Sequence, residues 1–282
     1  MQKLELFDET FDPNRTESYE LSIQLSLNGF SFCVNDLVRN CFIALVSNTY
    51  SNPVSDDDWF VPVQNIIESY EWIKNPFKKV IFSYESPIFT LVPKGFHEPE
   101  KSNMLLELVH PIPELYELRF NNIDDSATCI YALPSMLVSE WKAIHPKTHF
   151  IGFCEPVIAF HKSKNVNPKT NSITLAFNGK FAVVVISKGI QFQHCTTIDS
   201  LNPNDISYYL LNMCNSLDIE STETTVSVTG NHNETELLES LLSQFFKDYS
   251  LATNLDQNHF SYLLNRYKGK FANLFNQSLC EL

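Results

Sequence analysis

A near-repeat of one short sequence constrains the fold of this chain more than any other feature. Residues 22–34 read SIQLSLNGFSFCV and residues 172–184 read SITLAFNGKFAVV, with Ser, Ile, Leu, Asn, Gly and Val at matching positions. Each copy alternates apolar and polar residues on both sides of Asn-Gly, a pattern typical of two antiparallel strands joined by a two-residue type I′ turn. We therefore expect two related halves, each of which begins with a hairpin.

The composition is that of a globular protein with an acidic surface. The chain has 282 residues, 44% of them hydrophobic, and a chain of this length buries roughly 75% of its unfolded surface. The 33 acidic and 20 basic residues give a net charge of −13, which repels phosphate backbones, so nucleic acid is not an expected partner. The chain has seven cysteines without a CxxC pair and no apolar run of about 18 residues, so we expect a soluble, cytoplasmic protein.

The periodicity of apolar residues predicts the order βββαβ in both halves, since alternation indicates strands and three- to four-residue spacing indicates helices. In the first half the expected elements are strands at 21–27, 30–34 and 41–47, a helix at 63–73 and a strand at 79–84. In the second half they are strands at 173–177, 181–186 and 190–195, a helix at 203–216, a strand at 224–228 and a helix at 234–246.

The polar stretch KSKNVNPKTN just before the second copy marks the expected boundary between the halves. We expect a flexible N-terminal arm over 1–18, a first half over 19–165 and a second half over 166–282 that ends in a helix. Segment 113–153 has the pattern β-β-α-β and no counterpart in the second half. It is either the rest of the first sheet or an inserted subdomain.

The predicted order of elements resembles a mixed α/β architecture, the duplicated ribonuclease-H-like fold of the actin and Hsp70 type of ATPase. The strand at 226–230, Val-Ser-Val-Thr-Gly, followed by an amphipathic helix, is similar to the pilus-assembly and type II secretion members of that superfamily. The chain also resembles an uncharacterised domain-of-unknown-function family of Bacteroidetes-type bacteria with this architecture.

The resemblance implies a nucleotide site in a cleft between the halves, built from the two hairpin tips and the end of one strand. The corresponding residues here are Asn28, Gly29, Asn178, Gly179, Thr229, Gly230 and Asn231. In active members each tip reads Asp-x-Gly, and the Asp positions Mg²⁺ and water. Here Leu27 and Phe177 occupy the two Asp positions, and a tight hairpin favours Asn-Gly even without a ligand.

Other chemistries lack the residues they need. A ribonuclease-H nuclease needs carboxylates in the middle of its first strand, but Glu20 and Asp36 lie at the outer ends of the hairpin. Five potential metal ligands fit no zinc spacing, and Pro146 interrupts them, so we expect no metal site: His145, His149, Cys154, Glu155 and His161. Walker, Rossmann and Gly-x-Ser-x-Gly patterns are missing from the sequence.

The missing aspartates favour a catalytically inactive actin-like scaffold or adaptor, which binds a protein partner through its sheet faces, its cleft and segment 113–153. The alternative is a nucleotide-binding switch or weak ATPase that holds ATP through backbone groups at Gly29, Gly179 and Gly230, with Asp36 or Asp199 as a replacement carboxylate. A third interpretation is a divergent small-molecule kinase of the same superfamily.

Apolar residues near the C-terminus recur at helical spacing and predict a terminal helix. They are Phe260, Leu263, Leu264, Tyr267, Phe271, Leu274 and Phe275. We expect this helix to pack on its own body, and the alternative is contact with a membrane or a partner through the flanking Arg266, Lys268 and Lys270.

Overall fold

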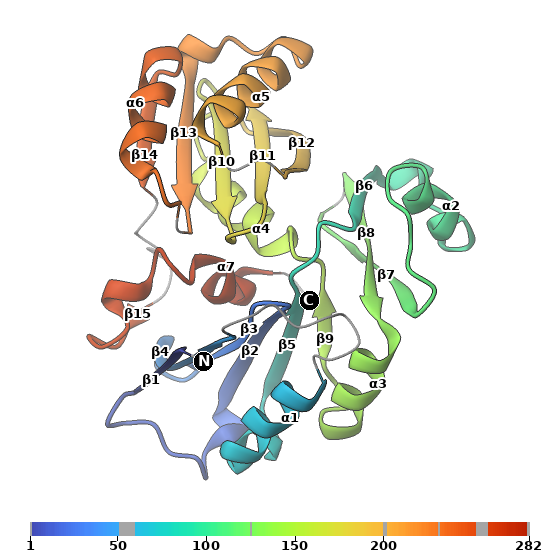
Figure 1. The fold of residues 1–282 in the computed structure, drawn as a ribbon, viewed down its shortest axis with the longest axis vertical. Helices are drawn as coiled ribbons and strands as arrows, with labels where there is room; N and C mark the ends of the chain where they lie inside the picture. Colours follow the sequence, from blue (N-terminus) through green and yellow to red (C-terminus); the bar gives the residue numbers. More distant parts are fainter. Residues whose placement is uncertain are drawn as a thin grey trace. The chain divides into compact units, whose positions relative to one another are not determined.

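The computed structural model describes residues 2–50, 60–124, 126–199, 202–230, 232–251 and 259–280. The chain divides into two compact units (Figure 1). Unit 1 comprises Met1–Glu155, Asp256–Arg266 and Glu281–Leu282, and unit 2 comprises Pro156–Leu255 and Tyr267–Cys280. Each unit is described by itself.

A seven-stranded mixed sheet forms the centre of unit 1. Its main path runs β1 (Gln2–Phe7), β4 (Cys41–Thr49), β3 (Gly29–Asp36), β2 (Tyr19–Ser26), β5 (Lys79–Tyr84) and β9 (His149–Ile151), and β15 (His259–Phe260) also pairs with β4. Strands β2, β3 and β4 form an antiparallel meander, whereas β5 is parallel to β2 and β9 is parallel to β5. The meander followed by parallel strands agrees with the predicted βββαβ order.

Two helices of unit 1 follow from apolar residues at helical spacing. Helix α1 (Phe60–Ser69) buries Val63, Ile66 and Ile67, and helix α3 (Ser135–Ile144) buries Leu137, Val138 and Trp141. The expected helix at 63–73 ends early because the chain continues from Ser69 into a separate 3₁₀ turn, Glu71–Lys74.

The segment without a counterpart forms a sheet of its own in unit 1. The order is β6 (Phe89–Pro93), β8 (Ala127–Pro134) and β7 (Tyr116–Asn122). Helix α2 (Ser102–Glu107) contributes Leu106 to a small core with Val92, Ile130 and Ala132. The separate sheet thus begins before residue 113, and β9, which lies inside 113–153, belongs to the seven-stranded sheet.

Unit 2 repeats the strand order of unit 1. Its sheet runs β12 (Gln191–Ile198), β11 (Ala182–Lys188), β10 (Asn171–Phe177), β13 (Thr224–Thr229) and β14 (Asp248–Leu251) (Figure 1). The first three strands are antiparallel, β13 is parallel to β10, and β14 is parallel to β13. This order matches β4-β3-β2-β5-β9, so the predicted pair of ribonuclease-H-like halves is confirmed.

Helices cover both faces of the sheet of unit 2. Helices α5 (Pro203–Ser216) and α6 (Thr235–Phe245) pack on one face, where Leu210 and Leu238 share a core with Ile173 and Leu175. Thr174 lies between those two strand residues and so points to the opposite face. There it contacts His161 of helix α4 (Glu155–Lys164).

The two hairpins differ in their turns, so the prediction of two type I′ Asn-Gly turns is wrong. In unit 1 Ser26 pairs directly with Gly29, so the turn is Leu27-Asn28, and neither residue has a positive φ. In unit 2 Phe177 pairs with Ala182, which leaves a four-residue turn in which Gly179 has a φ of 92°. Gly29 serves a different purpose, because a β-carbon there would lie 2.4 Å from the carbonyl oxygen of Asn48 on β4.

Both ends of the chain differ from the sequence-based expectation. The expected arm over 1–18 contains β1, whose register with β4 runs from Gln2 opposite Thr49 to Phe7 opposite Ala44. The expected C-terminal helix is divided: Phe260 lies in strand β15, and only Ala272–Phe275 forms an α-helix, α7. Gly269 interrupts the helical run, since glycine is a poor helix former. Among the described helices, none has the length and apolar character needed to cross a bilayer.

Candidate functional site

The first predicted tip, Asn28-Gly29, makes its contacts within the hairpin and sheet of unit 1. The Asn28 N–H donates to Ser26 Oγ at 3.1 Å, and its carbonyl oxygen accepts from the Tyr50 N–H at 2.8 Å. Gly29 is the first residue of β3 and pairs with Ser26 on one side and Thr49 on the other. Both residues therefore have a structural role in the sheet.

The structure brings four of the other predicted residues together at one edge of the sheet of unit 2. Strands β10 and β13 are parallel, and Ala176 pairs with Thr229, so the turn that begins at Asn178 and the segment Thr229-Gly230 follow adjacent strand ends. Gly230 has a φ of 78°. Asn231 lies outside the described residues.

Three backbone N–H groups at this edge donate to partners within the protein. Asn178 Oδ1 accepts hydrogen bonds from the N–H groups of Lys180 at 3.1 Å and Phe181 at 2.9 Å. The Gly230 N–H donates to the carbonyl oxygen of Gly269 at 3.0 Å. Phosphate loops bind their ligand through such N–H groups, so three of the candidate donors are engaged.

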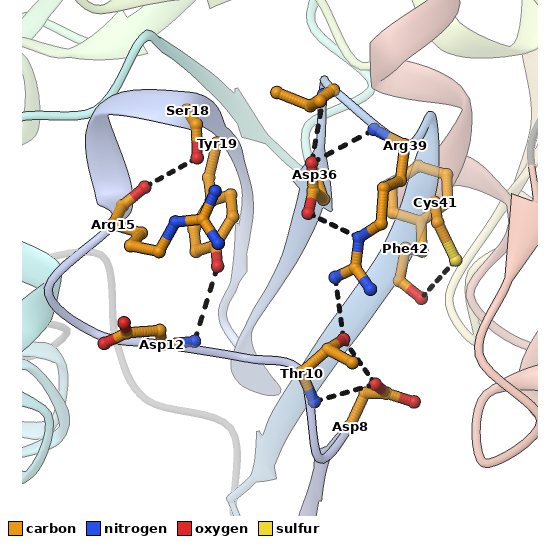
Figure 2. A network of polar contacts seen from close by, with 11 residues as sticks. Asp8, Thr10, Asp12, Arg15, Ser18, Tyr19, Asp36, Arg39, Cys41 and Phe42 are labelled. Carbon is orange, nitrogen blue, oxygen red and sulfur yellow. Dashed lines mark hydrogen bonds and ion pairs between the residues drawn. The ribbon is translucent and has the colours of Figure 1, made fainter.

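Asp36 and Asp199, the two carboxylates that could replace the missing turn aspartates, lie in different environments. Asp36 belongs to a polar network at the turn after β3 (Figure 2). Arg39 Nε donates to Asp36 Oδ2 at 2.8 Å, and the N–H groups of Val38 and Arg39 donate to Oδ1. Burial disfavours the charge, but these hydrogen bonds outweigh it and hold the pKa of Asp36 below its usual value. Asp199 follows β12 and is exposed.

The same network, which Figure 2 shows as far as Asp8, links the residues after β1 to those next to β15. Arg39 also donates to Thr10 Oγ1 at 2.7 Å, and Thr10 donates to Asp8 Oδ1. Asp8 Oδ2 accepts from Ser261 Oγ, next to β15. Asp36 and Arg39 therefore anchor the residues after β1 and next to β15 to the β3–β4 turn.

The five potential metal ligands are dispersed. His145 contacts the carbonyl oxygen of Ile73, Cys154 contacts Cys129, and His161 contacts Thr174 and Ser187. Across the described ranges, no group of three His, Cys, Asp or Glu side chains is placed to hold a metal ion.

A cavity of about 450 Å³ lies in unit 1 beside β7 and β9. Its lining consists of Arg119, Phe120, Asn121, Asn122, Thr148, His149 and Phe150, and we call it the β7–β9 cavity. Cavities of roughly 300–1,000 Å³ are typical ligand sites. The sequence singled out segment 113–153 but not these residues; the signal it offered was the amide pair Asn121-Asn122 at the end of a strand whose other residues alternate apolar and charged.

The charged groups of the β7–β9 cavity are partly neutralised. Arg119 forms an ion pair with Glu117 at 2.6 Å, and its guanidinium lies 4.9 Å from the centre of the Phe150 ring. Desolvation, and to a lesser extent the charge of Lys79, lower the pKa of His149 below its usual value. The cavity therefore presents amides, a hydroxyl and aromatic rings rather than strong net charge.

A buried cluster of hydrogen-bonded polar groups lies next to the residues that line the cavity. Asn121 Nδ2 donates to Glu155 Oε1 at 2.9 Å, and the Gly152 N–H donates to the same oxygen at 2.6 Å. Tyr131 donates its hydroxyl proton to the carbonyl oxygen of Phe150 at 2.6 Å. Asn121 and Phe150 thus belong both to this cluster and to the lining of the cavity.

The duplicated strand order and the interposed three-stranded sheet define a protein with the actin-like ATPase fold. Residues 8–249 match the family described as "Protein of unknown function (DUF3822)". The chain belongs to this family. A comparison with curated proteins finds no match.

Solved structures show the same fold. A Bacteroides thetaiotaomicron protein with an actin-like ATPase fold and unknown function is 17% identical with a TM-score of 0.83, over 96% of this chain and 100% of that chain. The PilM-PilN type IV pilus biogenesis complex matches with 12% identity and a TM-score of 0.59, over 94% of this chain and 98% of that chain. The cytoplasmic domain of EpsL from Vibrio cholerae also aligns, over 94% of this chain and 96% of that chain, with 12% identity and a TM-score of 0.46, a likeness too weak to count as the same fold. The first two matches confirm the predicted resemblance to the actin-like ATPase fold.

Proposed function

We propose that this protein is a catalytically inactive actin-like scaffold or adaptor that binds a protein partner in the cytoplasm. The observation that carries the proposal is the engagement of the turn that begins at Asn178. Asn178 Oδ1 accepts hydrogen bonds from the N–H groups of Lys180 and Phe181. The Gly269 carbonyl oxygen accepts a hydrogen bond from the Gly230 N–H. A phosphate would have to displace these bonds, each of which is worth about 1 kcal/mol.

The lack of carboxylates at the turns supports the same proposal. Phosphoryl transfer depends on a cation held between phosphates and fixed carboxylates. Leu27 lies in the first turn, and Phe177, which ends β10, is buried. Asp36 is occupied by Arg39 and two backbone N–H groups, so using it as a metal ligand would cost those bonds.

The β7–β9 cavity is the place where we propose that the partner binds. Strand β7 is an edge strand, with β8 as its one neighbour among the described strands. A free strand edge offers backbone donors and acceptors to an extended peptide, and the neighbouring cavity gives room for its side chains. The solved PilM structure is a complex with PilN, and that protein shares the fold of this chain.

The catalytic part of the proposal is tested by measuring phosphate release from Mg-ATP with the purified full chain. We expect no release, and no binding heat with a non-hydrolysable ATP analogue in calorimetry. The assay is repeated with Asp36→Asn, Asp36→Ala and Asp199→Ala. A rate of about one turnover per second that one of these substitutions abolishes would overturn the proposal.

The partner part is tested by affinity purification from the native organism. We expect a stable partner to be retained by the native chain and lost with Asn122→Trp, which fills the cavity. The matched control is Gln193→Trp on exposed β12 of unit 2, which should retain the partner. Equal recovery with both variants would place the interface elsewhere.

One observation favours the alternative of a nucleotide-binding switch. Asn178 Nδ2 is a buried donor without a hydrogen-bond partner among the described residues, so one group at this edge is available to a ligand. Saturable ATP binding that Asn178→Ala weakens tenfold, without any phosphate release, would favour the switch over the scaffold.

A further inference from the structure

Glu155 is a buried carboxylate whose hydrogen-bond partners are all neutral. Its relative exposure is 6%. The Gly152 N–H and Asn121 Nδ2 donate to Oε1, and Asn121 Nδ2 also lies 3.2 Å from Oε2. In the part of the chain that the structure describes, Glu155 has no ion pair. Burial without a neighbouring cation disfavours the charged form of a carboxylate and favours the protonated, neutral form.

Asn121 has more acceptors around it than protons to donate. Its amide nitrogen lies 2.9 Å from Glu155 Oε1, 3.0 Å from the Phe150 carbonyl oxygen and 3.1 Å from the Tyr131 hydroxyl. An amide group has two N–H protons, so these acceptors compete for them. A charged Glu155 is the strongest competitor, because hydrogen bonds to an ionised group are roughly twice as strong as neutral ones.

Other ionisable groups lie on the strands around Glu155. On β8, burial raises the pKa of Cys129 and of Tyr131 well above their usual values, so both stay neutral. Cys154 lies 3.6 Å from Cys129 and is a buried free cysteine. Arg119 on β7 forms an ion pair with Glu117, and desolvation lowers the pKa of His149 on β9. Desolvation raises the pKa of Glu155 to about 7, against the lowering effect of Gly152 and Asn121.

We propose that Glu155 is a proton-binding site and that Asn121 transmits its charge state to the wall of the β7–β9 cavity. When Glu155 is ionised, its carboxylate holds the Asn121 amide. When Glu155 is protonated, the amide turns its protons toward Phe150 and the cavity. By thermodynamic linkage, any ligand that contacts Asn121 then binds with a pH-dependent affinity. The inference concerns the free protein and does not depend on the proposed partner.

Nuclear magnetic resonance of the full chain tests this inference. With ¹³C-labelled Glu and ¹⁵N-labelled Asn, the Glu155 carboxyl carbon and the Asn121 side-chain amide should titrate together, with a midpoint near pH 7. Glu155→Gln identifies the carboxyl signal and should abolish the titration of the Asn121 amide. Asn121→Leu removes donors to the ionised form, so the Glu155 midpoint should rise by about 1 pH unit.

Asn122→Leu is the matched control, since Asn122 lines the same cavity but contacts Thr128 instead of Glu155. It should leave the Glu155 midpoint unchanged. A Glu155 midpoint near the ordinary value of about 4.5 would overturn the proposal, and so would an Asn121 amide that stays still while Glu155 titrates. The native chain alone decides both points if a variant does not fold.

Discussion

The backbone of Gly230 lies directly against the carbonyl oxygen of Phe177, so close that a β-carbon at position 230 would sit 2.1 Å from that oxygen. This approach brings the backbone at the ends of β13 and β10 into direct contact. The glycine at 230 is therefore explained by packing within unit 2, together with its φ of 78°.

Gly230→Ala should destabilise unit 2 far more than Gly179→Ala. At position 230 the new methyl group meets backbone atoms and a positive φ, so we expect a loss of about 3 kcal/mol or more. Gly179 has a positive φ but open space around it, so we expect Gly179→Ala to lower the free energy of unfolding by about 1 kcal/mol. Urea unfolding measures both, and Gly95→Ala, with open space and no positive φ, serves as the neutral control. Equal losses at 230 and 179 would contradict this account.

Asn178→Ala should cost about 1 kcal/mol in the free energy of unfolding, because two backbone N–H groups lose their side-chain acceptor. Asn178→Asp keeps the acceptor and should stay within about 0.5 kcal/mol of the native chain. Chemical denaturation and amide hydrogen exchange at Lys180 and Phe181 provide the readout. Unchanged exchange at these two amides in the Ala variant would show that Asn178 does not hold them.

His161 should make the protein less stable as the pH falls below neutrality. Burial lowers its pKa from 6.5 to about 4, and its ring contacts the hydroxyl groups of Thr174 and Ser187, both at 2.8 Å. Because the folded pKa is depressed, this contribution is fully present above pH 6.5. It is lost as the pH falls toward 4, by about 3 kcal/mol.

The measurement is the difference in unfolding free energy between the native chain and His161→Gln, followed from pH 7.5 to pH 4. The difference should stay constant from pH 7.5 to about 6.5 and shrink from there to pH 4, because Gln cannot take up a proton. His259→Gln, at an exposed position, is the control and should show a flat difference. A flat difference for His161→Gln as well would refute the prediction.

Deleting residues 258–282 should make the protein insoluble. The removed segment supplies buried side chains, among them Leu264, Leu274 and Phe275. Phe275→Ala alone should cost about 3–5 kcal/mol, whereas Tyr262→Ser, at a side chain that is 73% exposed, should be close to neutral. Solubility and thermal unfolding are the measurements. A soluble, folded truncation would instead identify the tail as an interaction element.

The sequence was informative wherever the deciding interaction is local. Alternation at Leu21, Ile23 and Leu25 predicts a strand because successive side chains point to opposite faces, and all three are buried. Helix α5 has the predicted bounds, Pro203–Ser216, because Asn202 caps it by accepting from the Asn204 N–H at 2.9 Å. The order of such elements was enough to indicate the fold.

The sequence was misleading wherever a distant part of the chain decides the conformation. Asn28-Gly29 and Asn178-Gly179 are identical pairs, yet the turns differ, because Gly29 is required by the approach of Asn48 on β4. Strand β1 is short and acidic residues follow it, so its alternation at 3–6 is easily overlooked; it forms a strand because its backbone pairs with β4. Phe260 follows a helical spacing but pairs with Phe42 in a sheet.

By itself, the sequence determined the two-fold repeat, the βββαβ order of each half and the absence of Asp at positions 27 and 177, since these depend on periodicity and residue identity. The tertiary structure decided the rest of the site. The Gly230 N–H donates to the Gly269 carbonyl oxygen, and Asn121 on β7 donates to Glu155 at the start of α4. Hydrogen bonds between residues far apart in the chain form only when folding closes the intervening loops, so no local pattern encodes them.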